Sequence, residues 1–363
     1  NQIGKEKLTE LTGNIAYAGF TAPKILWMKE NEPENFARIR KIMLPKDYLN
    51  YMLTGQFATD PSDASGTLYY DVKNRCWSEE MCSILGITSD MLPRVYESYE
   101  KIGTVKPELI EKLGLNEGCI LAAGAGDNAG AAVGMGIVGD GKCNISLGTS
   151  GTIFISSDNF ADDKFNHLHS FAHADGAYHA MGCILSAASC NNWWIRGIIG
   201  SETFSIEGDD ILPEDLGNNR VFFLPYLMGE RTPHLDPDAR GVFFGLSSNS
   251  DRGVFIRSVM EGVAFALKDL YTNVAAMTDI KEVYLTGGGA KSSLWAQIIS
   301  DVLNVELNII NISEGPSFGA ALIALVGSGL VGSFDEACKN VKVVKKVTPQ
   351  SSTEKYQKLY KLY

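Results

Sequence analysis

The sequence predicts an α/β protein built from two domains. Its 363 residues exceed the size of an ordinary single domain and can bury two sizeable cores. Apolar residues make up 45% of the chain and charged residues 21%, as in a soluble globular protein. Strands followed by glycine-rich turns occur twice in the C-terminal part. The character of the sequence changes near residue 138, so we expect one domain over residues 1–138 and another over 139–363.

The first domain is expected to combine helices and loops. Apolar residues within 36–43 are spaced as on one face of a helix, and a second helix is expected to end at Gly55. In TDPSDASG, Asp60 is a candidate N-cap and Pro61 suits the first position of a helix. Residues 119–127 start as a buried strand and then break into glycine.

The second domain is expected to alternate strands, glycine turns and helices. Residues 142–157 indicate two strands joined by a tight turn at 148–151. Residues 282–304 indicate a strand, a glycine-rich loop and an amphipathic helix. Residues 315–329 indicate a further helix, rich in glycine and alanine.

Charge and cysteine content narrow the partners and the compartment. The formal charge is −11, which argues against a nucleic-acid partner, although a local group of backbone amides can still bind phosphate. The seven cysteines are scattered and form no C-x-x-C, so we expect free thiols in a reducing compartment rather than disulfides or a zinc site. No signal peptide or membrane span is recognisable, and a cytoplasmic protein without a membrane partner is expected.

Four histidines lie close together in the sequence without indicating a metal site. They are His167, His169, His173 and His179. No acidic residues accompany them at the spacing of metal ligands. We therefore predict no metal ligands and expect surface or strand positions for these side chains.

Two glycine-rich turns are candidates for binding phosphate or a nucleotide. In LGTSGT (147–152), backbone amides and the hydroxyls of Thr149 and Ser150 could surround phosphate oxygens, but an ordinary β-hairpin explains the stretch equally well. In LTGGGAKSSLW (285–295), three glycines between a strand and a helix would let a flat ligand approach the backbone. Neither turn matches the two common nucleotide fingerprints.

One carboxylate stands alone among small apolar residues. Asp127, followed by Asn128, interrupts the stretch GAGDNAGAAVGMG (124–136). From these residues alone, the N-cap of a helix is the simpler interpretation, and a catalytic role is the alternative.

Taken in order, the motifs resemble those of the FGGY family of carbohydrate kinases, and among them the kinases that act on xylulose. The resemblance spans nearly the whole chain. Several pentose and polyol kinases share most of these stretches, so the family is better indicated than the sugar. The matching stretches are GFTAPKILWMKENEPE (19–34), LPKDYLNYMLTGQFATDPSDASGT (44–67), GAGDNAGAAVG (124–134), ISLGTSGT (145–152), FLPYLMGERTPHLDPDARGVFFGL (223–246), EGVAFALKD (261–269) and TGGGAKSSLWAQIISDVLN (286–304).

The resemblance implies an actin-like ATPase fold of the ribonuclease H-like type, with the sugar mainly on the first domain and ATP mainly on the second. It implies that Asp127 is the general base that takes a proton from the sugar hydroxyl, and that Asn128 binds a second hydroxyl. The implied reaction is ATP-dependent phosphorylation of a sugar, D-xylulose to D-xylulose 5-phosphate, with Mg²⁺ as cofactor. The chain could form a homodimer.

The resemblance also assigns nucleotide-binding residues in the second domain. The turn at 148–150 corresponds to a phosphate loop and the turn at 287–292 to an adenosine loop. Related glycerol kinases usually carry asparagine in place of Ser292. The predicted nucleotide-binding residues are Gly148, Thr149, Ser150, Asn191, Gly288, Gly289 and Ser292.

Two other features receive structural interpretations. GERTPH (229–234) is a family stretch in which Arg231 and His234 could line the cleft, but a turn fixed by ion pairs is preferred. Tryptophans at helical positions are expected in the core rather than as ligand platforms. These are Trp193, Trp194 and Trp295.

The sequence departs from the family at its start. Family members open with a strand and a D-x-G-T turn that binds the phosphates and the metal, then a His or Gln that contacts the sugar, and neither is found here. We therefore expect an N-terminally incomplete first domain and a chain that, alone, binds ATP or ADP without phosphorylating sugar. A non-catalytic nucleotide-binding remnant and a related pentose or polyol kinase are the alternatives to a xylulose-specific kinase.

Overall fold

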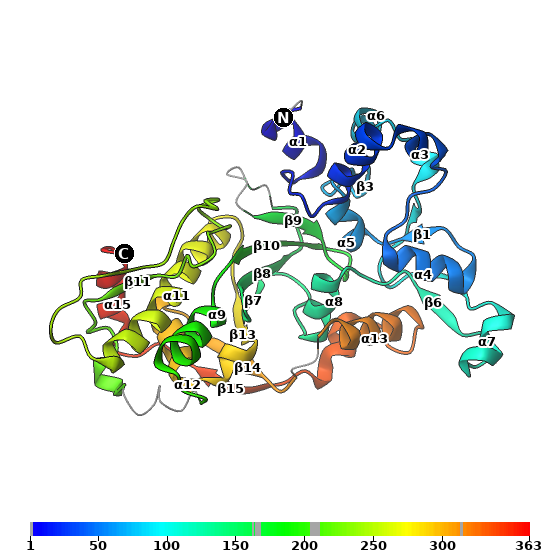
Figure 1. The fold of residues 1–363 in the computed structure, drawn as a ribbon. Coiled ribbons are helices and arrows are strands. Elements are labelled where there is room, and N and C mark those ends of the chain that lie inside the picture. The colour runs from blue at the N-terminus through cyan, green and yellow to red at the C-terminus, as the bar shows by residue number, and fades with distance from the viewer. Residues whose placement is uncertain (1–2, 162, 164–167, 204–210, 313–314) are drawn as a thin grey trace. The chain divides into compact units, whose positions relative to one another are not determined.

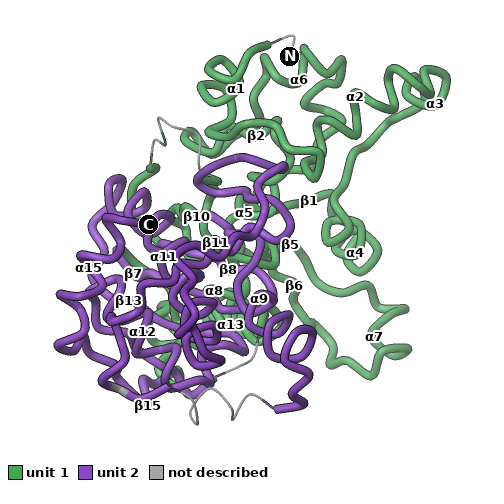
Figure 2. The backbone as a smooth tube through the Cα atoms, turned by 60° about the vertical axis from the view of Figure 1, so that its left-hand side comes forward, with its two compact units in different colours: residues 1–140, 156–180, 314–341 green, residues 141–155, 181–313, 342–363 purple. Residues whose placement is uncertain are grey.

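The chain forms two compact units, each assembled from three stretches of sequence (Figure 2). The computed structural model describes residues 3–161, 163, 168–203, 211–312 and 315–363. Unit 1 comprises Asn1–Asp140, Ser156–Ala180 and Glu314–Val341, and unit 2 comprises Gly141–Ile155, Met181–Ser313 and Lys342–Tyr363. The expected domains, residues 1–138 and 139–363, remain a prediction.

The N-terminal part of unit 1 is a group of short helices with its own apolar core. Leu8 of α1, Ile25 of α2 and Leu85 of α6 are buried in this core. Such a small core is enough to fix helices that are too short to be stable alone. The elements here are α1 (Lys5–Thr12), α2 (Thr21–Asn31), α3 (Pro33–Arg38), β2 (Tyr70–Asp71), β3 (Cys76–Trp77), α6 (Glu79–Leu85) and η2 (Ser89–Met91).

The helix predicted over 36–43 is wrong in its extent. Helix α3 ends at Arg38, and the following backbone is extended. The amide of Ile42 donates to the carbonyl of Met91 at 2.8 Å, outside any helix. The backbone leaves the helical conformation at Ile39, whose ψ is 133°, and Pro45 separately disfavours helical backbone at Leu44.

Two other local predictions in unit 1 are confirmed. Helix α4 (Pro45–Thr54) ends at Gly55, whose φ of 78° is readily adopted only by glycine. Asp60 caps the short helix α5 (Pro61–Ala64), because its side chain accepts a hydrogen bond from the amide of Ser62 at 2.9 Å.

The rest of unit 1 contains two short strand pairs, β1 with β4 and β5 with β6, and two closely packed helices. The strand expected after residue 119 is β6, which is half-buried rather than buried, because it belongs to a two-stranded ribbon with β5. Helices α8 and α13 approach so closely that a Cβ on Gly319 would lie 1.7 Å from the carbonyl oxygen of Gly130. The elements are β1 (Ala58–Thr59), η1 (Ser65–Thr67), β4 (Arg94–Val95), β5 (Lys101–Thr104), α7 (Pro107–Leu113), β6 (Ile120–Ala122), α8 (Asp127–Gly134), β9 (His169–Ala172), α13 (Pro316–Gly327), α14 (Phe334–Ala337) and η6 (Cys338–Asn340).

Unit 2 is built on a sheet whose strands lie in the order β15-β14-β13-β7-β8. Strand β13 runs parallel to both β14 and β7, whereas β15 and β8 run antiparallel to their neighbours. The predicted hairpin is confirmed, with Leu147 paired to Gly151 across the turn. The strands are β7 (Lys142–Leu147), β8 (Gly151–Ser157), β13 (Glu282–Thr286), β14 (Leu307–Ile310) and β15 (Val343–Val347), and β10 (Tyr178–Ile184) begins in unit 1 and ends in unit 2.

Helices α11 and α12 of unit 2 (Figure 1) pack against each other and are joined by a tryptophan side chain. The indole of Trp295 on α12 is 1% exposed and donates to the carbonyl of Met260 on α11 at 3.0 Å. The predicted core position of Trp295 is therefore confirmed. The remaining elements are α9 (Ala188–Asn192), the π-helix η3 (Trp193–Ile199), η4 (Pro213–Asp215), β11 (Phe222–Leu224), β12 (Val242–Phe244), α11 (Arg252–Ala275), η5 (Gly288–Lys291), α12 (Ser293–Leu303) and α15 (Thr353–Tyr360).

The strand, loop and helix predicted over 282–304 appear as β13, η5 and α12, and the helix predicted over 315–329 appears as α13. Within the described residues, none of the helices has the length and apolar character needed to cross a membrane.

Candidate active site

Asp127 is the first residue of α8 and is open to solvent. The residue before the helix is Gly126, so Asp127 is not the N-cap that the simpler interpretation made it. Its Oδ1 accepts a hydrogen bond from the amide of Asn128 at 2.8 Å. Asp127 and Asn128 are both exposed, whereas Ala129 and Gly130 after them are buried. A ligand can therefore reach the two side chains predicted to bind the sugar, at a helix end that favours negative charge.

A lysine surrounded by carboxylates lies beside the loop that leads to Asp127. The Lys46 Nζ atom lies 2.9 Å from Oδ1 of Asp47, 3.0 Å from Oδ1 of Asp60 and 4.0 Å from Oδ2 of Asp63. It also donates to the carbonyl of Ala123 at 3.2 Å. One ammonium group thus joins the start of α4, helix α5 with its cap, and the end of β6.

The carboxylate of Asp60 is fully buried and continues this network. Its Oδ2 accepts from the hydroxyls of Ser62 at 2.5 Å and Ser98 at 2.9 Å, as well as from the capped amide of Ser62. The Ser62 Oγ in turn accepts from the amide of Gly126 at 3.0 Å. The residue directly before Asp127 is therefore bonded to the helix that Asp60 caps.

The electrostatics of this cluster are dominated by burial and by an excess of negative charge. Burial alone would lower the pKa of Lys46, but the carboxylates of Asp60, Asp47 and Asp63 raise it above its ordinary value. Burial raises the pKa of Asp63 to about 7. Lys46 lowers this pKa, and the neighbouring carboxylates, including that of Asp127, raise it further. Asp63 is therefore a carboxyl group that titrates near neutral pH.

The predicted phosphate turn of unit 2 is fixed from one side. The carbonyls of Gly148 and Thr149 accept from the amides of Ala188 and Ala187 at 2.9 and 3.0 Å. The hydroxyl of Ser150 donates to the carbonyl of Leu185 at 3.0 Å, so its proton is already engaged. Thr149 is exposed. The side chain of Thr149 is therefore accessible to a ligand, and the binding of phosphate at this turn stays a prediction.

The predicted adenosine loop meets the phosphate turn at Leu147. Gly287 has a φ of 87°, and a Cβ there would lie 2.6 Å from the carbonyl oxygen of Leu147. A Cβ on Gly289 would lie 2.9 Å from the Cβ of the same leucine. Leu147 directly precedes Gly148, so the two glycine turns predicted separately lie side by side in the structure. Only glycine backbone permits this approach.

Two further predicted residues lie on helices next to these turns. The Ser292 hydroxyl caps α12 by accepting from the amide of Trp295 at 3.2 Å. Asn191 is 4% exposed and lies in α9, the helix whose preceding residues are bonded to the phosphate turn. Their roles toward a nucleotide stay predictions.

The GERTPH stretch forms a turn that is held mainly by hydrogen bonds. The buried Glu230 Oε1 accepts from the amides of Leu185 at 3.0 Å and Arg231 at 2.6 Å. His234 accepts or donates through Nε2 to the hydroxyl of Tyr226 at 3.0 Å and lies 3.8 Å from Asp269. These contacts support the structural interpretation of the stretch.

The described histidines lie in or next to strands, as predicted, whereas Trp193 and Trp194, predicted in the core, are only half-buried. Trp193 stacks on Phe223 and Trp194 on Phe255, so both tryptophans belong to an aromatic cluster. Three of the histidines are buried in or next to strands, not on the surface: His169, His173 and His179. His167 lies outside the described residues. Among the residues that the structure describes, no three His, Cys, Asp or Glu side chains are grouped as metal ligands.

Lys46 and Asp63 are functional candidates that sequence patterns do not reveal. Both lie in a stretch that matched the family, but their spacing of 17 positions indicates nothing by itself. The N-cap prediction for Asp60 was the one available signal, because it placed a carboxylate at the start of α5.

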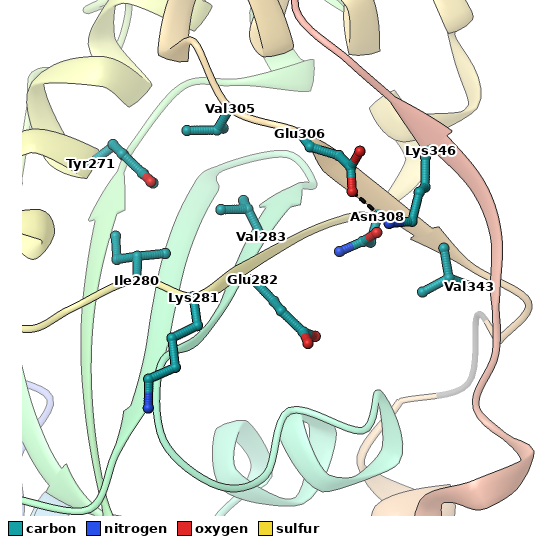
Figure 3. A pocket seen from close by; sticks show the side chains of 10 residues that line it. All are labelled: Tyr271, Ile280, Lys281, Glu282, Val283, Val305, Glu306, Asn308, Val343 and Lys346. Atoms are coloured by element: carbon teal, nitrogen blue, oxygen red, sulfur yellow. Dashed lines mark hydrogen bonds and ion pairs between the residues drawn. The ribbon is translucent and has the colours of Figure 1, made fainter.

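A separate pocket of about 380 Å³ lies at the other end of the unit 2 strands (Figure 3). Lys281 and Glu282 on its wall lie at the start of β13, whereas the adenosine loop follows the end of that strand. Glu306 and Lys346 pair across another wall at 2.6 Å. None of the predicted site residues lines this pocket.

Comparisons with known proteins agree with the motif order. The model described as FGGY family of carbohydrate kinases, N-terminal domain, matches residues 1–134, and the C-terminal domain of the same family matches residues 143–328. A xylulose kinase of Lactococcus lactis is 36% identical over 99% of this chain and 72% of its own length. A xylulose kinase of Escherichia coli is 41% identical over 88% of this chain and 66% of its own length.

The structural comparison leads to the same family. The crystal structure of a xyloylose kinase from Brucella ovis matches with a TM-score of 0.93 and 36% identity, and the match covers all of this chain and 75% of that one. The prediction of an actin-like ATPase fold is confirmed by this match together with the two family models. The chain belongs to the FGGY family of carbohydrate kinases.

Proposed function

We propose that this kinase phosphorylates D-xylulose to D-xylulose 5-phosphate with ATP as the phosphate donor. The choice of sugar is supported by relatives that carry the name xylulose kinase. The observation that carries the chemistry is the exposed carboxylate of Asp127 beside the exposed amide side chain of Asn128 at the start of α8.

Asp127 is proposed to act as the general base. As the sugar hydroxyl oxygen forms a bond to the γ-phosphorus of ATP, its proton passes to the Asp127 carboxylate. The bond from the γ-phosphorus to the oxygen that bridges it to the β-phosphorus breaks, and ADP leaves with that electron pair. Asn128 binds a neighbouring hydroxyl and orients the sugar. Phosphoryl transfer asks a protein mainly for such positioning and for charge stabilisation.

The nucleotide is proposed to bind in unit 2. The amides of Gly148–Ser150 and the Thr149 hydroxyl would contact phosphate oxygens, and the backbone at Gly288 and Gly289 would pass the base and ribose. The support is the side-by-side arrangement of the two turns at Leu147. Ser292 and Asn191 would contribute from the flanking helices.

Mg²⁺ is proposed as the cofactor and would be held mainly by the ATP phosphates and water. The support is general: Mg²⁺ bound to nucleotides typically uses few protein carboxylates. When bound, Mg²⁺ neutralises charge on the transferring group.

We also propose a cytoplasmic location, supported by seven cysteines that are all free thiols. The proposed oligomeric state is a homodimer.

A substrate panel tests the function. The natural gene product that contains these 363 residues is incubated with ATP, Mg²⁺ and individual ketopentoses or polyols, and ADP release is measured. We expect the highest kcat/KM with D-xylulose. A higher kcat/KM with another pentose or with a polyol would identify that compound, instead of D-xylulose, as the substrate. Nucleotide binding without sugar-dependent ADP release would favour the non-catalytic remnant.

A further inference from the structure

The loop that leads to Asp127 is held at both of its ends by hydrogen bonds. None of the residues that hold it was predicted as a site residue. At one end, the carbonyl of Ala123 accepts from Lys46 at 3.2 Å and from the Asn50 side chain at 3.0 Å. At the other end, the amide of Gly126 donates to Ser62. The loop is thus tied to α4 and α5, helices that lie about 60 to 80 positions earlier in the sequence.

Lys46 is the side chain that joins these two attachments. Its ammonium group contacts the Ala123 carbonyl and also Asp60, the residue that accepts from Ser62. Asp60 is fully buried and Lys46 is 21% exposed, so this ion pair is shielded from solvent. Removing one partner of such a pair leaves a buried charge uncompensated, which is strongly unfavourable.

We propose that Lys46 is a positioning residue for phosphoryl transfer: it fixes the Ala123–Gly126 loop against α4 and α5 and so holds the Asp127 carboxylate where it meets the sugar hydroxyl. This inference rests on the proposed role of Asp127 as the base.

The same lysine controls the charge beside Asp127 through Asp63. The helix α5 backbone at Asp63 packs against the loop, since a Cβ on Gly126 would lie 3.4 Å from the Asp63 Cα. Asp63 changes charge near pH 7, and Lys46 favours its ionised form. An ionised Asp63 places a second negative charge near the group that takes up the proton, which favours proton uptake. The charged and titratable groups that face Asp63 are Lys46 and Asp47 from α4, Asp60 from the cap of α5, Tyr69, and Asp127 from α8.

The first test compares Lys46→Gln with Lys46→Arg in the natural gene product, with Lys112→Gln as the control for loss of an exposed lysine of unit 1. We expect kcat with D-xylulose to fall by about 10- to 100-fold in Lys46→Gln, because displacement of a reacting group by about 1 Å can cost about 100-fold. Lys46→Arg should recover most of the loss, and ADP affinity should stay within about twofold of the parent, since the predicted nucleotide residues are in other segments.

The second test uses pH and remains informative if Lys46→Gln fails to fold. We expect kcat/KM of the parent to rise through an inflection near pH 7 that is absent in Asp63→Asn, a variant at a side chain that is 29% exposed. In Lys46→Gln, or in Lys46→Gln/Asp60→Asn if the single variant unfolds, the inflection should move up by about one pH unit, because the favourable charge is gone. A purely structural role of Lys46 would lower the melting temperature and leave kcat of the folded protein within about threefold of the Lys112→Gln control.

The outcomes separate this inference from the proposed function. If Asp127→Asn is inactive while Lys46→Gln keeps kcat within about threefold of the Lys112→Gln control, Lys46 does not position the base. If the pH profile of kcat/KM keeps its inflection in Asp63→Asn, the charge of Asp63 does not influence the proposed base. If Asp127→Asn itself keeps its turnover, the proposed base is wrong, and the inference built on it falls as well.

Discussion

The small residues around Asp127 serve the packing of the backbone. A Cβ on Gly134 would lie 3.0 Å from the amide nitrogen of Gly319, and a Cβ on Gly319 would lie 1.7 Å from the carbonyl oxygen of Gly130. Side chains at these positions would push α8 away from α13. The run of glycine and alanine therefore places the start of α8 close to its neighbours, and the single carboxylate remains exposed at the end of the helix.

Asp127→Asn should abolish most turnover without affecting folding. A general base typically contributes about 10²- to 10⁴-fold, so kcat with D-xylulose should fall by a factor in that range. The amide retains the size of the side chain and can still accept from the amide of Asn128. The measurement is ADP formation, together with the melting temperature and the ADP affinity, which should match the parent. Asp90→Asn, at an exposed position in unit 1, is the control. Turnover near the parent value would rule out Asp127 as the base.

At the residue scale, sequence patterns predicted the role of a single residue better than they predicted which distant residues it contacts. The cap at Asp60 was predictable because an N-cap depends on the residues next to it. The pairing of Lys46 with Asp60 was not, because it depends on α4 and α5 folding against the end of β6. Asp63 has a raised pKa only as a consequence of that packing.

At the scale of elements, two neighbouring glycines in a turn of unit 2 have different roles: one is needed for folding, and the other is free for ligand binding. Gly287 has a left-handed φ and no room for a Cβ against Leu147. Gly288, its neighbour, has no positive φ, and a Cβ added there would meet no atom of a more distant residue within 4 Å. The two positions therefore form a matched pair, in which one glycine is required by packing and the other faces open space.

Gly287→Ala should lower the unfolding free energy by about 1 to 3 kcal/mol, because alanine is strained in that conformation and would contact the Leu147 carbonyl. Gly288→Ala should leave the free energy of unfolding within about 0.5 kcal/mol of the parent and weaken ADP binding, because its methyl group would extend into the space proposed for the nucleotide. Urea unfolding and calorimetric titration with ADP measure the two effects. Equal ADP affinity in Gly288→Ala and the parent would argue against the adenosine assignment.

Element predictions succeeded where a local signal was strong. The β7–β8 hairpin and the end of α4 at Gly55 follow from glycine at defined positions. The extent of α3 was wrong because the apolar spacing in 36–43 does not show that the backbone becomes extended at Ile39. Apolar periodicity alone does not reveal that the amide of Ile42 donates to Met91 at the end of η2.

For the whole molecule, order along the chain is a poor guide to which segments fold together. Residues 156–180 and 314–341 belong to unit 1, although both follow the start of unit 2. Helix α13 reaches α8 through close contacts between glycines, and such contacts leave no periodic signal in a single sequence. Local patterns predicted only an α/β protein, and the family resemblance supplied its actin-like ATPase fold.

The stability of the chain should depend on pH through buried carboxyl groups, and Glu261 in unit 2 is the clearest case. Glu261 on α11 is 2% exposed and accepts from the hydroxyl of Tyr356 on α15 at 2.8 Å and from the Asn219 side chain at 3.1 Å. Burial raises its pKa from 4.5 to about 7, despite the nearby Arg257 guanidinium. The folded state therefore holds the proton more tightly than the unfolded state does.

Because the folded pKa is the higher one, this contribution is fully present below about pH 4.5 and is lost as the pH rises to about 7. The loss amounts to at most about 3.5 kcal/mol, at about 1.4 kcal/mol for each unit of pKa difference. Glu261→Gln keeps the size of the side chain and has no proton to lose, so its unfolding free energy should change less over this pH range than that of the parent. Denaturant unfolding at about pH 5 and about pH 8 measures both, with Glu354→Gln, an exposed position on α15, as the control. Parallel pH dependence in Glu261→Gln and the parent would show that this carboxyl group does not titrate in the folded protein as its burial requires.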